Sequence, residues 1–169
     1  MTMTTPEFNA LSEVVARAEL LRCCGATRWA SGMLRRRPFE DKDAALDAAD
    51  AVWAATGEKD WLEAFGHHPR IGGKDALRAK FAATKTWAQG EQAAVAAADE
   101  ATLDALEKGN AGYEARFGFI FIVCATGKSA AELLALLNAR LPNDRASELR
   151  IAAAEQVKIA KIRLEKLLT

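Results

Sequence analysis

The chain has 169 residues, half of them hydrophobic, and it carries 23 basic and 23 acidic residues. A chain of this length can bury a substantial core as one domain, and so high a hydrophobic content excludes disorder over most of its length. Because the formal net charge is zero, the composition does not indicate an extended nucleic-acid-binding surface, which usually shows a basic excess.

The cysteine pattern favours a reducing compartment, and no targeting or membrane segment is recognised. Cys23, Cys24 and Cys124 are an odd set with two adjacent members, which is not the pattern of a disulfide framework. They also lack the CxxC spacing of a zinc site, so we expect three buried thiols. The N-terminal residues lack the basic and apolar regions of a signal peptide, and the apolar stretch 120–125 is too short to cross a bilayer. We therefore expect a cytoplasmic protein with no membrane partner.

The spacing of apolar residues predicts helices over most of the first half of the chain. We expect a first helix capped by Asn9 or Ser12 and ended by Gly25, and a short second helix capped by Thr27 that stops before Pro38. Asp41 and Asp43 are expected to open a third helix that ends at Gly57, and a short helical turn is expected at Trp61, Leu62 and Phe65.

The second half is also predicted to be helical, with one exception. Its expected helices run from Lys74 to Phe81, from Thr86 or Trp87 to about Leu106 with an end at Lys108-Gly109-Asn110, from a Ser129 cap to Arg140, and from Asn143 or Asp144 to Leu168. Residues 117–124 are rich in aromatic and β-branched side chains and look like a strand, but no partner strand is visible. The predicted fold is therefore all-α: a single compact multi-helix domain over residues 1–169, with one extended apolar segment near 117–124.

Both histidines of the chain lie side by side in the Gly/Pro-rich stretch 66–73. Histidine changes charge near neutral pH, and Pro69 holds the preceding His68 in an extended conformation. From position alone two interpretations are open: a site of proton transfer, or a polar loop that happens to contain histidines.

Two charged residues interrupt apolar helix faces. Glu91, beside Gln92, has small apolar neighbours at helical spacing, so its carboxylate lies either in solvent at the edge of that face or in a pocket with a raised pKa. Arg163 lies on the apolar face of the last helix, where it serves either a structural ion pair or a planar anionic ligand. Together with His68, these groups suit cofactor-free proton transfer on a small anionic substrate.

Metal and nucleotide sites are not indicated. Successive side chains of an extended loop point apart, so the adjacent histidines do not readily share an ion, and no HExxH motif is present. Residues 125–129 read Ala-Thr-Gly-Lys-Ser, but a P-loop needs a glycine where this chain has Ile122. Ser129 is therefore expected to cap a helix.

These residues form a pattern that resembles the 2-oxo-4-hydroxy-4-carboxy-5-ureidoimidazoline (OHCU) decarboxylase family, which makes (S)-allantoin in uric acid degradation. The resemblance covers nearly the whole chain and depends most on His-Pro-Arg-Ile-Gly at 68–72 and Glu-Gln at 91–92. Further matching pieces are Phe8-Asn9, Cys23-Cys24-Gly25, Trp29-Ala30, Arg37-Pro38-Phe39, Phe117-Gly118-Phe119, Gly127-Lys128-Ser129, Lys158-Ile159 and Arg163-Leu164. It implies an all-helical homodimer that acts on a small anionic ureidoimidazoline with no cofactor, and the charge balance gives no reason to expect a nucleic-acid partner.

The resemblance also implies roles for individual residues. Its catalytic residues correspond to His68, Glu91 and Arg163, and its substrate-binding pocket corresponds to Pro69, Ala88, Gln92 and the backbone around Phe119, Ile120 and Phe121. The family commonly has a serine where this chain has Ala88, and His67 has no assigned role. Two alternatives remain open: a related helical enzyme that acts on another ureide or imidazoline, and an inactive interaction module on the same scaffold.

Overall fold

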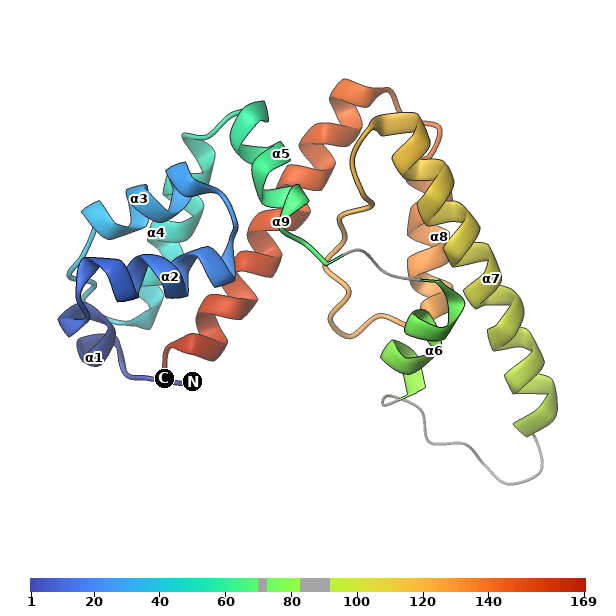
Figure 1. The fold of residues 1–169 in the computed structure, drawn as a ribbon, viewed down its shortest axis with the longest axis horizontal. Helices are drawn as coiled ribbons and strands as arrows, with labels where there is room; N and C mark the ends of the chain where they lie inside the picture. The colour runs from blue at the N-terminus through green and yellow to red at the C-terminus, as the bar shows by residue number, and fades with distance from the viewer. Residues whose placement is uncertain (70–72, 83–91) are drawn as a thin grey trace. The chain divides into compact units, whose positions relative to one another are not determined.

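The computed structural model describes residues 1–69, 73–82 and 92–169 (Figure 1). These residues form nine α-helices and no strand, so the predicted all-α class is confirmed. Their contacts divide the chain into two units: unit 1 comprises residues 1–68 and 149–169, and unit 2 comprises residues 69–148. That the whole chain is one domain stays a prediction. None of the described helices is long and apolar enough to cross a membrane.

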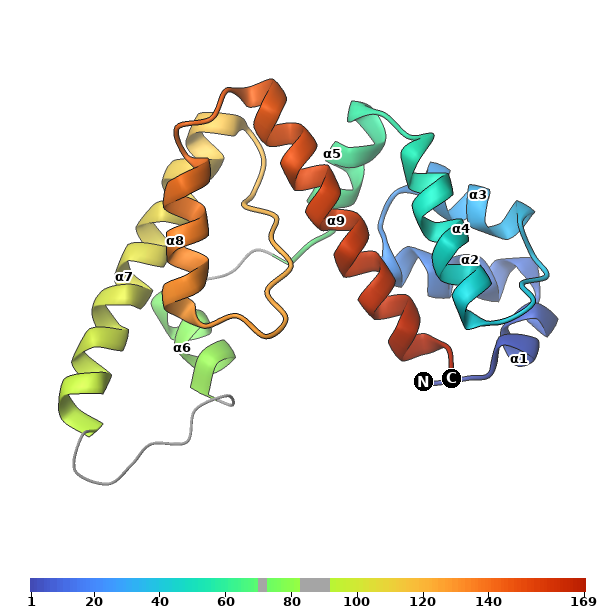
Figure 2. The ribbon, with the colours of Figure 1, turned by 180° about the vertical axis from the view of Figure 1, so that it is seen from behind.

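Unit 1 is built from both ends of the chain. It contains α1 (Thr5–Ala10), α2 (Glu13–Cys23), α3 (Thr27–Arg35), α4 (Lys42–Ala54), α5 (Glu58–Gly66) and most of α9 (Arg145–Leu167). Within it, α3 packs against α2, α4 and α5. The two termini lie side by side in both views (Figures 1 and 2), where Met3 and Leu168 form an isolated parallel bridge.

Side-chain caps explain where several helices of unit 1 begin. Ser12 caps α2 and Asp41 caps α4, as the sequence predicts. The alternative cap, Asn9, is wrong: it lies inside α1, and its amide exchanges two hydrogen bonds with the backbone of Phe39, at 2.8 and 3.0 Å. Arg37 also donates hydrogen bonds to the carbonyls of Phe8 and Leu11. These bonds fix the segment 37–39 against α1, so the sequence pieces Phe8-Asn9 and Arg37-Pro38-Phe39 have a structural role.

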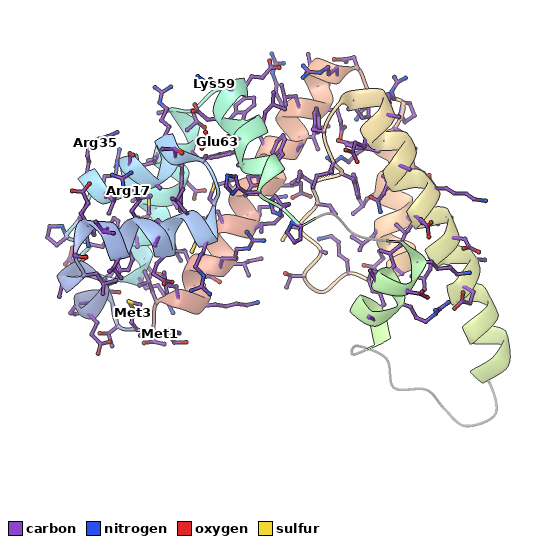
Figure 3. All side chains as sticks on the ribbon, viewed as in Figure 1. Met1, Met3, Arg17, Arg35, Lys59 and Glu63 are labelled. Atoms are coloured by element: carbon purple, nitrogen blue, oxygen red, sulfur yellow. The ribbon has the colours of Figure 1, made fainter. Side chains whose placement is uncertain are left out.

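The start of α3 differs from the prediction. Thr27 is its first helical residue and not its cap, and the capping residue Ala26 offers no side-chain acceptor. A carboxylate from α5 supplies the acceptor instead: Glu63 accepts a hydrogen bond from Thr27 N at 2.5 Å. Figure 3 shows Glu63 on α5, one turn from Lys59. Hydrogen bonding to the Thr27 backbone lowers the pKa of Glu63, as expected for a carboxylate at a helix N-terminus.

Unit 2 contains α6 (Lys74–Ala82), α7 (Gln92–Phe117) and α8 (Ala130–Arg140). In it, α7 packs against both α6 and α8, as Figures 1 and 2 both show. Ser129 caps α8 by accepting from Glu132 N at 3.2 Å, which confirms its predicted role. Residues 118–129 connect α7 to α8 without helix or strand, as expected for the extended apolar segment.

The predicted end of the long helix at Lys108-Gly109-Asn110 is wrong, because α7 continues to Phe117. A Cβ at Gly109 would lie 2.1 Å from Cδ2 of Leu137, a fully buried side chain of α8. This glycine therefore serves close helix packing and not helix termination. The helix ends instead before Gly118, whose φ of +81° is a conformation that favours glycine. The predicted helix start at Thr86 or Trp87 lies outside the described residues. Gly57, expected to end α4, is the N-cap of α5, and α4 ends at Ala54.

Candidate active site

His68 lies just after the last turn of α5. The helix ends at Gly66 with His67 as its C-cap, and His68 N donates to the Phe65 carbonyl at 3.2 Å. The imidazole is half-buried, and its Nε2 lies 2.6 Å from Oε1 of Gln156 on α9. The ring is therefore held by its backbone on one side and by a side chain 88 positions away on the other.

Gln156 is a neighbour of the candidate site that the sequence did not identify. Its side chain is fully buried, on a face of α9 where Ala152 and Ala160 are also buried. Its Nε2 has no hydrogen-bond partner among the described residues, so its bond to His68 is the interaction that offsets the burial of the amide. The only sequence signal was its position seven residues before Arg163, on the same helix face.

The surroundings of His68 favour the neutral imidazole. Burial lowers the pKa of His68 below the ordinary 6.5, and electrostatic interactions with Arg163 and His67 lower it further. The hydrogen bond to Gln156 acts in the opposite direction and raises the pKa, by less than burial lowers it. His68 is consequently suited to exchange hydrogen bonds as a neutral group at pH 7.

Arg163 lies two turns after Gln156 on α9 and is half-buried. Its Nη1 donates to the Cys23 carbonyl at 3.3 Å, and it forms no ion pair with any carboxylate that the structure describes. It also lines a depression of about 220 Å³ in unit 1. The other lining residues are Met1, Glu19, Arg22, Cys23, Lys166 and Leu167. Glu19 pairs with Arg22, so the charges of these two residues offset each other. The net charge of the lining side chains is therefore positive, from Arg163 and Lys166.

Cys23 and Cys24, which adjoin this region, are buried free thiols, and so is Cys124. The expectation of three buried thiols is thus confirmed. Burial raises the pKa of Cys23 to about 11 and that of Cys24 to about 12. Both sulfurs stay protonated near pH 7 and are unsuited to nucleophilic catalysis.

The candidate pocket segment of unit 2, residues 119–121, carries two buried aromatic rings. Phe119 and Phe121 are buried, and both rings contact Tyr113 edge-on, at centroid distances of 5.9 and 5.2 Å. Ile120 between them is half-buried. That the backbone of residues 119–121 lines a pocket stays a prediction.

A buried polar network fixes that segment. Arg140 Nη1 donates to the Ile122 carbonyl at 2.7 Å, and Arg140 Nε donates to Glu148 at 2.5 Å. The Tyr113 hydroxyl donates to the same carboxylate oxygen at 2.5 Å, and Asn143 donates to the other oxygen at 3.1 Å. Burial, followed by the bond to Glu148, raises the pKa of Tyr113 well above its usual range. The hydroxyl therefore remains a donor at every physiological pH.

The structure describes some of the predicted site residues and not others. His68 and Arg163 lie in unit 1, where the charge of Arg163 acts on His68. Pro69 is exposed and begins unit 2. Ala88 and Glu91 lie outside the described residues, and Gln92 is described only as the first residue of α7. That these residues and 119–121 form one site with His68 stays a prediction. No described group of three or more His, Cys, Asp or Glu side chains could hold a metal ion.

Comparison with known proteins gives one consistent family. The sequence profile of OHCU decarboxylases matches residues 9–165. The uric acid degradation bifunctional protein TTL of Arabidopsis thaliana is 37% identical over 147 residues, which are 86% of this chain and 45% of that protein. The 2-oxo-4-hydroxy-4-carboxy-5-ureidoimidazoline decarboxylase of Amia calva is 34% identical over 101 residues, 60% of this chain and 57% of the relative. This chain spans about half the length of these curated relatives.

A solved structure is similar over almost its full length. The crystal structure of an OHCU decarboxylase in the presence of (S)-allantoin is 35% identical and aligns with a TM-score of 0.70. The alignment covers 88% of this chain and 96% of that one. The similarity therefore extends from sequence to the arrangement of helices.

Proposed function

The chain belongs to the OHCU decarboxylase family, and on that premise we propose that it converts OHCU to (S)-allantoin in uric acid degradation, without a cofactor. The observation that carries the proposal is the environment of His68. A half-buried imidazole, kept neutral by burial, lies under the influence of an arginine that has no carboxylate partner among the described residues. That pairing suits a small anionic substrate that must exchange protons.

The chemistry of the substrate explains why no cofactor is needed. Its carboxylate and hydroxyl share a carbon that is next to an imine. When the bond to carbon dioxide breaks, its electron pair forms a carbon–carbon double bond, and the imine pair moves to nitrogen, which takes a proton. The resulting enol then loses its hydroxyl proton to become a carbonyl, while the former imine carbon gains one. In total, one proton replaces one carbon dioxide.

The protein's part is to position these groups and to choose the face. We assign His68 and Glu91 to hydrogen bonds with the hydroxyl and the ring near the breaking bond, and Arg163 and Gln92 to the ureido and carbonyl end. A guanidinium matches planar carbonyl and carboxylate groups. Protonation from one face then produces the (S) product. Pro69, Ala88 and the backbone of residues 119–121 complete the pocket in this proposal.

Circular dichroism of the product tests the reaction directly. Freshly generated OHCU is mixed with the protein, and rapid appearance of a single allantoin enantiomer is expected. A racemic product at the spontaneous rate would refute the function and favour the inactive module. Faster turnover of an analogous ureide would favour the related enzyme.

The two adjacent histidines provide a matched pair of variants. His68→Asn is expected to lower kcat by about 10²–10⁴-fold, the usual contribution of a positioned acid or base. His67→Asn keeps the backbone C-cap of α5 and is expected to turn over as the parent does. Equal activity of the two variants would contradict the assignment of His68.

We further propose that the protein is a cytoplasmic homodimer. The family resemblance supports the dimer, and the chemistry of three unpaired cysteines supports a reducing compartment. Light scattering coupled to gel filtration is expected to give twice the mass of 18.2 kDa. A monomer at micromolar concentration would refute the dimer and leave the activity untouched.

A further inference from the structure

The contact between His68 and Gln156 defines which atom donates the hydrogen bond and which accepts it. An amide oxygen only accepts hydrogen bonds, so at 2.6 Å from Oε1 of Gln156 the Nε2 atom of His68 must carry a hydrogen. A neutral imidazole has one such hydrogen, so its other nitrogen, Nδ1, holds a lone pair. The tautomer of a histidine is set by the hydrogen bond that one of its nitrogens makes.

We propose that Gln156 is a positioning residue that holds His68 in the Nε2–H tautomer, so that His68 meets the substrate through Nδ1 as a hydrogen-bond acceptor. The tautomer itself depends only on residues of unit 1. Its catalytic meaning rests on the function proposed above.

The position of Gln156 argues for such a role. A glutamine on a helix face among buried alanines is costly, because its amide loses water on both polar atoms. A leucine there would bury apolar surface at no such cost. Gln156 is 0% exposed, and one of its two amide ends has no partner among the described residues. The amide is thus poorly explained by stability alone, and its satisfied end points at the candidate catalytic imidazole.

The amide is also rigidly placed. The helix turn before it is anchored by Trp53, whose Nε1 donates to the Ala153 carbonyl at 2.9 Å across 100 positions of sequence. Ala152, Ala153 and Ala160 around it are all less than 5% exposed. A side chain held in this way keeps the orientation of its hydrogen bond. A residue that orients a catalytic group from behind must itself be fixed in this manner.

An acceptor at Nδ1 fits the proposed reaction. The substrate hydroxyl ends as a carbonyl, so it gives up a proton during the reaction, and a lone pair directed at it stabilises that change. The described groups that act on the charge of His68 are Arg163 from α9, the neighbouring His67 and the amide of Gln156. Burial, Arg163 and His67 all favour the neutral ring that this role needs.

Nitrogen NMR of the histidine side chain tests the tautomer. The chain has two histidines, so His67→Asn leaves His68 as the single ring to observe in ¹⁵N-histidine-labelled protein. We expect a protonated Nε2 and an unprotonated Nδ1 at pH 7.5. The opposite tautomer, which Gln156 would impose if its NH₂ group faced the ring, would overturn the inference, and so would an equal mixture.

Two substitutions separate positioning from packing. Gln156→Met keeps the volume but has no strong acceptor, and it is expected to lose the tautomer preference and about 10- to 100-fold in kcat, with KM changed less than threefold. Gln156→Glu keeps the acceptor, and it is expected to retain the tautomer and most of kcat while moving the acid limb of the pH profile upward. If Gln156→Met does not fold, the parent tautomer and the Gln156→Glu profile still decide. An unmoved limb in the glutamate variant would show that Gln156 does not act through His68.

The outcomes distinguish this inference from the proposed function. A parent protein that does not accelerate OHCU decarboxylation refutes the function, whereas the NMR result does not depend on activity. An active parent with the Nδ1–H tautomer refutes the inference alone.

Discussion

Replacing Glu148 by glutamine leaves the Arg140 guanidinium, which is 7% exposed, without its negative partner. Glu148 is fully buried and accepts from Tyr113, Arg140 and Asn143. Removing one partner of a buried ion pair costs about 3–5 kcal/mol because the other charge stays buried. For comparison, Tyr113→Phe removes one hydrogen bond to a charged acceptor and should cost about 1.5–3 kcal/mol.

Urea unfolding measures both variants. For a chain of 169 residues, one kcal/mol corresponds to roughly 2–4 °C in Tm. In thermal unfolding, Glu148→Gln is therefore expected to lower Tm by about 6–20 °C. In urea, the loss of unfolding free energy is followed by far-ultraviolet circular dichroism. A loss below about 1 kcal/mol, or one smaller than that of Tyr113→Phe, would refute the view that the charge of Glu148 matters.

Tryptophan fluorescence shows where the loss acts. Trp29, Trp53 and Trp61 all lie in unit 1, and each indole donates a hydrogen bond. With Trp87 replaced by phenylalanine, fluorescence then reports unit 1 alone. A circular dichroism transition that shifts ahead of the fluorescence transition would place the damage in unit 2, as the network requires.

Three further predictions concern unit 1. Because the pKa of His68 is lowered from 6.5 and the neutral ring is the active form, the acid limb of kcat/KM should lie below pH 6.5. The free energy of unfolding should also decrease as the pH falls below 6.5, because His68 binds a proton more readily in the unfolded chain than in the native protein. An acid limb above pH 6.5 would contradict the lowered pKa of His68. Cys23 and Cys24, with pKa values near 11 and 12, should react with a thiol reagent far more slowly in the native protein than in urea, and equal rates would refute their burial. Gly25→Ala places a Cβ 2.4 Å from Cβ of His67 and should cost about 1–3 kcal/mol by overpacking, as well as activity. Gly66→Ala, with nothing within 4 Å, is the matched control, and an equal effect of the two would remove the steric explanation.

Sequence predicted those parts of the fold whose signals are local. Ser12, Asp41 and Ser129 cap the helices that follow them because a short side chain reaches a backbone N–H three residues on. The failures have distant causes. Thr27 was expected to cap α3, but Glu63 supplies the acceptor from 36 positions away. Gly109 has the local signal of a helix end, and only the presence of Leu137 on α8 gives its true role.

The candidate site divides in the same way. His68 and Arg163 could be selected because a proline-fixed histidine and an arginine on an apolar face are unusual within their own elements. Gln156 could not, because a glutamine in a helix ordinarily faces water, and its burial depends on how α5 and α9 pack. A local pattern shows which residues are chemically unusual, whereas the partners that orient them are a property of tertiary structure.

The division of unit 1 between the two ends of the chain sets the order in which the protein can mature. During synthesis, residues 1–68 leave the ribosome first, and all of residues 69–148 follow before residues 149–169 appear. The first segment therefore waits without the C-terminal side chains that complete its core, among them Leu164 of α9 and Leu168 just after it, both 0% exposed. Closing a loop of 80 residues costs entropy that local contacts do not recover. His68 and Gln156 come together only at that closure, so the candidate catalytic centre is among the last features of the chain to form.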